Sequence, residues 1–274
     1  MDDKLAIIKD ICYLFCCPPK LSHIVAKLSF VPPIPTYNVI KCENSDDYRL
    51  TLKESSYSTD RIKVFFTETS RKSRIVVAYL KKYPNKRAKN TILYSHGNAV
   101  DVGELVVFMN SFVEKYETDV VVYDYSGYGA SSGQTLEANL YTDSDAVIDC
   151  MINSLNIPVS EIILYGQSIG TVPTVKLATK NKVAAVILHS PLTSGLKVVC
   201  PDSNISLCCD PFKNIDRVEK IKSYTLIIHG TDDKMIGVNH GHALYEKLKF
   251  KLQPSWIDGA GHNDIEGYNE YFDR

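Results

Sequence analysis

A serine between two glycines lies within this 274-residue chain, directly after an apolar run. The segment is LYGQSIG (164–170), a G-x-S-x-G pattern around Ser168, and the TVPTVKLAT that follows is typical of a helix. A strand, a sharp turn and a helix together form a nucleophile elbow, which exposes the serine hydroxyl at the helix N-terminus. An ordinary loop serine would show the same five letters without this context. The pattern therefore predicts a nucleophile at Ser168.

A nucleophilic serine needs a base that takes its proton, and the base needs an acid that orients it. In a chain with a nucleophile elbow, the acid and then the histidine follow the serine in sequence. Asp232 and Asp233 lie in IIHGTDDKM (227–235), where an apolar run ends. The base is predicted to be His262 in DGAGHND (258–264), because it follows the last strand-like run in a glycine-flanked loop. Asp233 is preferred to Asp232, but spacing does not decide which side chain faces the site.

The oxyanion formed by such a serine needs two backbone N–H donors. One is predicted at Ile169, directly after the nucleophile, and the other in SHGNAVD (95–101), which links a strand-like run to a helix. Within that loop Asn98 is preferred, and Ala99 is the alternative. His96 is expected to support the loop. His189 and His229 lie in strand-like runs and are expected to be structural. Of the other histidines, His23 lies in the N-terminal arm, and His240 and His242 lie in a predicted helix.

The elements that must position these residues alternate regularly from about Arg61 onward. Nearly continuous apolar runs separated by helix-like stretches predict an α/β fold, with a mostly parallel central sheet and helices on both faces. The predicted reactive residues follow strand ends, which share one edge of such a sheet and form its usual ligand site. The strand-like runs are 75–80, 91–97, 119–125, 161–166, 183–190, 224–230 and 254–262.

We divide the chain into two parts at residue 43. Residues 1–43 are predicted to be an N-terminal arm that contains cysteines. Its end, FVPPIPTY (30–37), is expected to be extended, because three prolines interrupt helix and ladder hydrogen bonding. Residues 44–274 are predicted to be the catalytic domain, which starts with a polar surface loop over 44–60.

The composition argues against several classes of protein. With 31 basic and 32 acidic side chains, the net charge of -1 gives no electrostatic reason to bind nucleic acid. No paired Cys-x2-Cys motif, G-x-G-x-x-G or P-loop occurs, so we expect neither a metal nor a cofactor. The start Met-Asp-Asp is unlike a secretory signal, and the apolar run 11–17 is shorter than the roughly 20 residues that cross a bilayer. A cytosolic body is therefore expected.

Several strings taken together resemble the alpha/beta hydrolase domain-containing protein 17 group. They are SHGNAVD, YDYSGYGASSG, ILYGQSIGTVPTV, LHSPLTSG, IIHGTDD and GAGHND, with LFCCPP and AKLSFVPPIPTY near the start. The resemblance extends from about Ile11 to the C-terminus. It implies an alpha/beta-hydrolase fold and a membrane-anchored serine hydrolase that removes palmitate from cysteines of other proteins. It also implies Ser168, Asp233 and His262 as the triad, and so favours Asp233 where spacing leaves the choice open.

This chain departs from the group's pattern at two places. Lys234 stands where the group carries acidic residues, which we expect to change surface charge more than mechanism. The group generally continues into a longer C-terminal helix than the one that ends at Arg274, so we expect weaker packing beneath the His262 loop.

Three cysteines lie among apolar residues near the start: Cys12, Cys16 and Cys17. Given the resemblance they fit S-acylation, and a small hydrophobic plug in the core is the alternative. One acyl chain binds a membrane only reversibly, whereas two or more hold a protein firmly. We therefore expect a lipid-anchored peripheral protein on the cytoplasmic face of the plasma and endosomal membranes. The expected substrates are S-palmitoylated membrane proteins.

Two other functions fit the same residues. The predicted fold and triad would suit a general esterase or lipase, and a hydrolase-like chain with little activity would serve as a membrane adaptor. The acyl groove is expected near the insertion 192–212. Within it, Cys208 and Cys209 are interpreted as lining, core or additional acylation sites.

Overall fold

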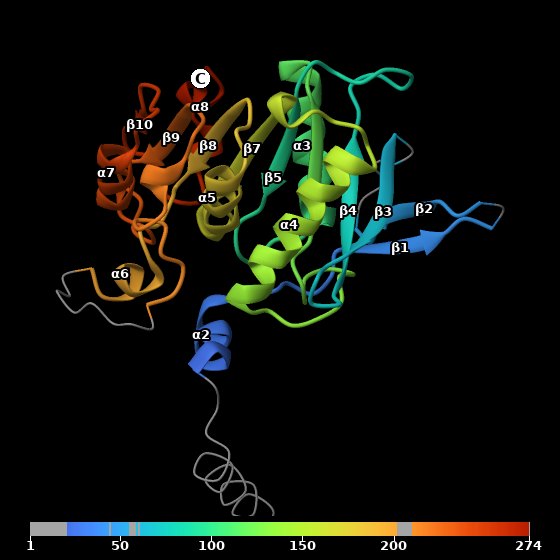
Figure 1. The fold of residues 1–274 in the computed structure, drawn as a ribbon, viewed down its shortest axis with the longest axis horizontal. Helices are drawn as coiled ribbons and strands as arrows, with labels where there is room; N and C mark the ends of the chain where they lie inside the picture. Colours follow the sequence, from blue (N-terminus) through green and yellow to red (C-terminus); the bar gives the residue numbers. More distant parts are fainter. Residues whose placement is uncertain (1–20, 44, 55–58, 60, 202–209, 274) are drawn as a thin grey trace, which may run out of the picture.

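The computed structural model describes residues 21–43, 45–54, 59, 61–201 and 210–273. Ten strands in this part of the chain form one sheet, in the order β1-β2-β3-β4-β6-β5-β7-β8-β9-β10 (Figure 1). The strands are β1 (Tyr37–Lys41), β2 (Tyr48–Leu52), β3 (Ile62–Glu68), β4 (Arg74–Leu80), β5 (Thr91–Ser95), β6 (Asp119–Tyr123), β7 (Ile162–Gln167), β8 (Ala185–His189), β9 (Thr225–Gly230) and β10 (Ser255–Ile257).

The strands from β6 to β10 pair in parallel, and the strands from β1 to β4 pair antiparallel. β5 and β6 are buried along their whole length, because helices cover both faces of this half of the sheet. Their sequences are accordingly apolar at consecutive positions. The predicted α/β fold with a mostly parallel sheet is confirmed.

Helices pack on the two faces in separate groups (Figure 1). Met109 of α3 and Tyr271 of α8 join one buried cluster, while Met151 of α4, Val175 of α5 and Leu244 of α7 join the other. The α-helices are α2 (Leu21–Ser29), α3 (Val102–Tyr116), α4 (Glu137–Asn153), α5 (Thr171–Lys180), α6 (Gly195–Val199), α7 (Val238–Lys247) and α8 (Asn269–Phe272). Short 3-10 turns are η1 (Val159–Glu161), η2 (Ser168–Gly170), η3 (Val218–Lys220) and η4 (Ile265–Gly267).

The surface loop predicted over residues 44–60 is wrong in its middle, where the structure has β2. Leu50 is fully buried in this strand, whereas Arg49 beside it is exposed and Thr51 is half-buried. One buried position in a short, polar strand leaves too little apolar alternation for a sequence pattern to detect.

The arm predicted before residue 44 contains two regular elements, α2 and β1. The prolines interrupt only the segment between them, since they lie at 32–35. Phe30 and Tyr37 are both buried in the same clusters as the rest of the domain. Packing is therefore continuous across residue 43, at least from residue 21 onward.

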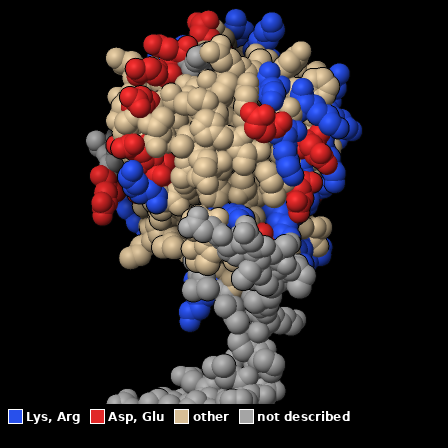
Figure 2. Space-filling view, turned by 90° about the vertical axis from the view of Figure 1, so that its left-hand side faces the viewer, with Lys and Arg blue, Asp and Glu red and all other residues tan. Residues whose placement is uncertain are grey.

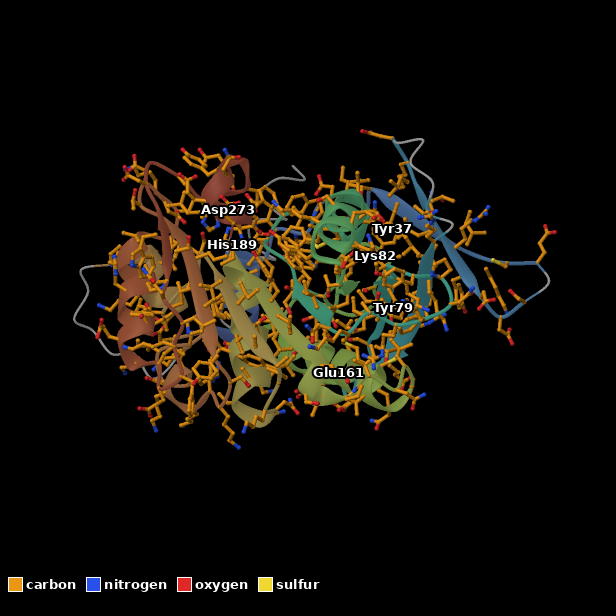
Figure 3. The ribbon with its side chains drawn as sticks, turned by 90° about the horizontal axis from the view of Figure 1, so that it is seen from above. Tyr37, Tyr79, Lys82, Glu161, His189 and Asp273 are labelled. Atoms are coloured by element: carbon orange, nitrogen blue, oxygen red, sulfur yellow. The ribbon has the colours of Figure 1, made fainter. Side chains whose placement is uncertain are left out.

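Tyr37 fixes β1 to the loop after β6, because its hydroxyl donates to the buried carboxyl of Asp124. Burial raises the pKa of Asp124 to about 7. Seen from above, Tyr37 and Tyr79 lie on the antiparallel half of the sheet, and His189 and Asp273 lie on the parallel half (Figure 3).

The end of the molecule formed by α7 and β10 carries charges of both signs. Figure 2 shows uncharged residues in the middle of this face, with acidic and basic side chains around them. Among the helices of the described residues, none has the length and apolar character needed to cross a membrane.

Candidate active site

The predicted nucleophile elbow is present between β7 and α5. Ser168 has a φ of 53°, in the left-handed region that favours glycine, and it begins the short turn η2. Side chains at the two flanking glycines would not fit: a Cβ at Gly166 would collide with Thr174, and one at Gly170 with the Ser95 carbonyl. These clashes explain the small residues of G-x-S-x-G. Since Ile169 lies in the first turn of η2, its N–H has no acceptor earlier in that helix.

The structure brings Ser168, His262 and Asp233 together although they are far apart in sequence. His262 Nε2 lies 3.0 Å from Ser168 Oγ, and His262 Nδ1 lies 2.7 Å from Asp233 Oδ2. These distances join the three side chains in one hydrogen-bonded series. Asp232, the alternative acid, is exposed. Tertiary structure therefore selects Asp233 as the partner of His262.

Asp233 accepts hydrogen bonds on both oxygens. Its Oδ1 accepts the N–H groups of Met235 at 2.9 Å and Ile236 at 2.8 Å. Burial alone would raise the pKa of Asp233, but hydrogen bonds to His229, His262 and Ile236 outweigh burial and hold that pKa well below its usual range. The carboxylate can then only accept, so His262 Nδ1 carries the proton. His262 Nε2 is left to accept the Ser168 hydroxyl proton.

A second link between the nucleophile and the His262 loop was not predicted from the sequence. The Gln167 amide donates to Glu266 Oε1 at 2.8 Å, and Tyr94 donates to Gln167 Oε1 at 2.7 Å. Gln167 directly precedes Ser168, and Glu266 lies in η4 just after His262. Burial raises the pKa of Glu266. The x before the serine in G-x-S-x-G was the available signal, but one sequence gives no partner for it.

The loop 95–101 packs against the elbow. A Cβ at Gly97 would meet the Gln167 side chain at 3.7 Å, and one at Gly170 would meet the backbone of Ser95 and His96. Ala99, with a φ of 59°, donates its N–H to Asn98 Oδ1 at 3.2 Å. Asn98 is therefore the less engaged of the two predicted donors in this loop.

Three other histidines expected to be structural are buried beneath the site. Burial lowers the pKa of His96 to about 4, and its Nδ1 lies 2.7 Å from the Gly97 carbonyl. Burial, followed by the charges of His262 and His229, lowers the pKa of His189 to about 3. His229 Nε2 lies 2.7 Å from the Ile236 carbonyl and 3.4 Å from Asp233 Oδ2. His229 thus supports the acid as well as the fold.

Several proteins resemble this chain over nearly its whole length. Alpha/beta hydrolase domain-containing protein 17B of Xenopus tropicalis is 47% identical over 271 residues, which cover 97% of this chain and 93% of that protein. This chain belongs to the alpha/beta hydrolase domain-containing protein 17 family. Human protein 17B is 46% identical over the same shares of the two chains, and protein 17C of Mus musculus is 41% identical over 97% of this chain and 92% of its own.

Broader similarity agrees with this family. The family model described as serine aminopeptidase, S33 matches residues 86–205, which include the elbow. An esterase of Pyrococcus furiosus has a TM-score of 0.65 at 17% identity, covering 88% of this chain and 95% of its own. Acetyl xylan esterase 1 of Thermoanaerobacterium sp. has a TM-score of 0.60 at 17% identity, covering 85% and 88%. At this identity the two structures show the fold alone, which is that of the alpha/beta hydrolases.

The predicted acylation sites of this member of the 17 family, Cys12, Cys16 and Cys17, lie outside the described residues, as do Cys208 and Cys209. Among the described cysteines, Cys42, Cys150 and Cys200 are free thiols. Within the same residues, no group of three or more His, Cys, Asp or Glu side chains could hold a metal ion.

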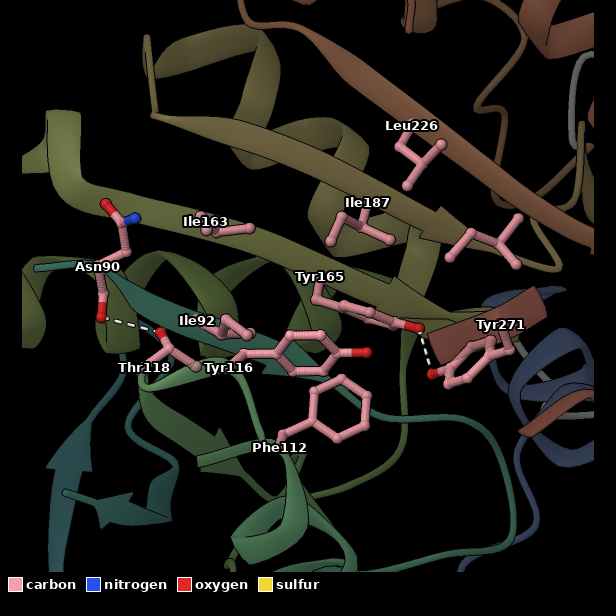
Figure 4. Close-up of a pocket in the computed structure, with 11 residues that line it drawn as sticks. Asn90, Ile92, Phe112, Tyr116, Thr118, Ile163, Tyr165, Ile187, Leu226 and Tyr271 are labelled. Atoms are coloured by element: carbon pink, nitrogen blue, oxygen red, sulfur yellow. Dashed lines mark hydrogen bonds between the residues drawn. The ribbon is translucent and has the colours of Figure 1, made fainter. Parts of the chain in front are cut away.

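An apolar cleft of 190 Å³ lies away from the predicted acyl groove at 192–212, on the face of the sheet that carries α3 and α8 (Figure 4). Its lining includes Phe112, Ile187 and Leu226. At one end of the cleft, the hydroxyls of Tyr165 and Tyr271 are hydrogen-bonded at 2.6 Å. Neither Ser168 nor His262 lines it. The acyl groove at 192–212 stays a prediction.

Proposed function

We propose that this protein is a serine hydrolase that cleaves palmitoyl-cysteine thioesters on membrane-associated proteins. The observation that carries the proposal is the series Ser168 Oγ, His262 Nε2 and Asp233 Oδ2, with separations of 3.0 Å and 2.7 Å across the histidine. Membership of the 17 family and the sequence resemblance described above support palmitoyl-cysteine as the substrate.

The first half of the reaction acylates the enzyme. His262 Nε2 takes the hydroxyl proton of Ser168 while Oγ attacks the thioester carbonyl carbon. The N–H groups of Ile169 and Asn98 would stabilise the oxyanion that forms. When the intermediate collapses, the C–S bond breaks and the imidazolium gives its proton to the cysteine sulfur. The products are the palmitoyl-serine ester and the free thiol.

The second half releases the fatty acid. His262 removes a proton from a water molecule, and the resulting hydroxide attacks the acyl carbon. The C–O bond to Ser168 then breaks, and the histidine returns the proton to Oγ. Asp233 remains ionised throughout, because its lowered pKa disfavours protonation, and it stabilises each imidazolium.

Location at a membrane is part of the proposal. S-acylation of Cys12, Cys16 and Cys17 would place the enzyme on the cytoplasmic face of the plasma and endosomal membranes, beside its lipidated substrates. Serine at all three positions is expected to move the protein from the membrane fraction to the soluble fraction. A triple variant that stays with the membranes would contradict this anchoring.

Matched substrates test the chemistry. The purified protein is given a palmitoyl-cysteine peptide and the same peptide with palmitoyl-serine, and Ser111→Ala, an exposed serine of α3, serves as control for Ser168→Ala. We expect the thioester to be preferred at least tenfold in kcat/KM. Ser168→Ala should lose at least about 1,000-fold in kcat, as for other triad nucleophiles.

Two outcomes would support the alternatives. Preference for the oxygen ester would favour a general esterase or lipase. Both solved structures described above are named as esterases. A fluorophosphonate probe that labels neither the wild type nor Ser168→Ala would favour a non-catalytic adaptor.

A further inference from the structure

The Asn98 side chain connects the oxyanion loop to the N-terminal segment. Its Nδ2 donates to the Ser29 carbonyl at 2.8 Å, and its Oδ1 accepts the Val31 N–H at 2.9 Å. The same Oδ1 also accepts the Tyr128 hydroxyl at 2.7 Å. One amide therefore binds the chain on both sides of Phe30, at the end of α2. These bonds use the side chain alone and do not engage the Asn98 backbone N–H, which is the oxyanion donor in the proposed function.

Phe30 holds this end of α2 against the body of the domain. Only 6% of Phe30 is exposed, and its ring makes edge contacts with Tyr128 at 6.5 Å and Phe212 at 5.8 Å between ring centroids. Tyr128 is shared, because it contacts Phe30 with its ring and Asn98 with its hydroxyl. The apolar contact and the amide bonds thus form one unit, which we call the arm clamp: Ser29, Phe30, Val31, Asn98 and Tyr128.

The loop needs such support because its backbone is strained next to Asn98. Ala99 is held at a φ of 59°, a conformation that costs a non-glycine residue about 1 kcal/mol or more and persists only when its surroundings impose it. On its other side the loop contacts the elbow through Gly97 and Gln167. Beyond the clamp, the loop is held at its two ends, where Tyr125 donates to the His96 carbonyl at 2.6 Å and Asp101 accepts the Thr36 N–H at 2.8 Å. Removal of the clamp would therefore free the middle of the loop, which carries the Asn98 N–H.

We propose that Asn98 is a positioning residue whose side chain fixes the oxyanion loop to the segment at the end of α2, so that turnover depends on whether this segment is docked. The proposal rests on the proposed function, because it assigns the oxyanion to the Asn98 N–H. It goes beyond that function by making the N-terminal segment a part of the active site. The predicted acylation sites lie shortly before α2, so the clamp would also connect membrane attachment to catalysis.

Full-length Asn98→Ala and Phe30→Ala test the clamp on a short, water-soluble thioester, which removes any effect of membrane binding. Asn98→Ala keeps the backbone N–H and deletes only the side-chain bonds, and the Phe30 ring packs against Tyr128 and Phe212. We expect kcat to fall about 10- to 100-fold in each, the range for a displaced oxyanion donor, with KM changed less than threefold. The double variant should be no worse than the more severe single one, since both disrupt the same clamp.

Ile34→Ala is the matched control, because Ile34 lies in the same segment with 87% of its surface exposed. Its kcat should equal that of the wild type. Amide hydrogen exchange in peptides that cover 95–101 should be faster in Phe30→Ala than in Ile34→Ala. If Phe30→Ala does not fold, Phe30→Leu, which loses the ring contacts but keeps apolar bulk, gives the same comparison.

Different results would contradict the proposed function and the arm clamp. A wild-type protein that shows neither turnover nor labelling of Ser168 by the fluorophosphonate probe would contradict the proposed function. A wild type that turns over, with both variants within twofold of its kcat or with unchanged exchange at 95–101, would overturn the clamp alone. Lower thermal stability at unchanged kcat would also overturn it, because the clamp would then stabilise the fold only.

Discussion

Replacement of Asp233 by asparagine exchanges one carboxylate oxygen for an NH2 group at nearly constant volume. In the structure Oδ1 faces two backbone donors, the N–H groups of Met235 and Ile236 at 2.9 Å and 2.8 Å. An NH2 group placed there would meet two donors and leave them unpaired. The amide oxygen of the variant must therefore stay at that position, and its NH2 group must face His262 Nδ1.

This orientation reverses the tautomer of His262. Nδ1 becomes the acceptor, so in the neutral ring the proton moves to Nε2, which lies 3.0 Å from Ser168 Oγ. An Nε2–H cannot take the serine proton. We expect Asp233→Asn to lose about 1,000- to 10,000-fold in kcat, or about 4 to 5.5 kcal/mol of transition-state stabilisation, with little change in KM.

The assay is steady-state hydrolysis of the soluble thioester at pH 7, with Asp232→Asn as the control for the same chemical change next to the site. Asp232 is exposed, so its variant should keep wild-type kcat. If Asp233→Asn keeps more than a tenth of wild-type kcat, or if the two variants lose equal amounts of kcat, Asp233 does not set the tautomer of His262 in the way described.

Three more predictions follow from the packing around the site. Gly170→Ala should destabilise the fold by at least about 3 kcal/mol in urea unfolding, because its Cβ would collide with the Ser95 and His96 carbonyls. Gly267→Ala, where a Cβ meets nothing within 4 Å, should be near neutral, and equal losses would contradict the steric argument. Glu266→Ala should cost about 1 kcal/mol of stability, because it removes the acceptor of the half-buried Gln167 amide, and a loosened His262 loop should lower kcat roughly tenfold. No change in either quantity would refute the link. His189→Phe should change the pH dependence of unfolding. The pKa of His189 falls from 6.5 to about 3 on folding, so between those pH values only the unfolded wild type binds this proton. As pH falls below 6.5, the wild type should therefore lose about 1.4 kcal/mol of stability per pH unit relative to the variant. Parallel stability curves for the two proteins from pH 7 to 4.5 would refute this.

The sequence was sufficient for the parallel half of the sheet. β5, β6 and β7 are buried on both faces, so hydrophobicity appears at nearly every position and gives a strong local signal. The antiparallel half was largely missed, since β1 and β2 alternate weakly and bury few side chains. The helix α2 was missed because the prolines that follow it dominated the interpretation of the arm.

The prediction of the reactive groups also rested on local information. Ser168 was marked by its two glycines, which are required because side chains there would collide with Thr174 and Ser95. His262 was marked by its place after the last strand-like run. Residue type and chain order were enough to predict both, because a nucleophile elbow is built from consecutive residues and the histidine follows it in sequence.

Only the folded chain decides which groups meet. Asp233 was preferred to Asp232, but spacing did not decide between them. The turn after β9 buries Asp233 and exposes Asp232. The links from Gln167 to Glu266 and from Asn98 to the end of α2 join residues with no sequence relation to each other. A side chain's direction and its distant partners depend on how strands and loops pack in three dimensions, and a linear pattern records residue type and spacing but not that packing.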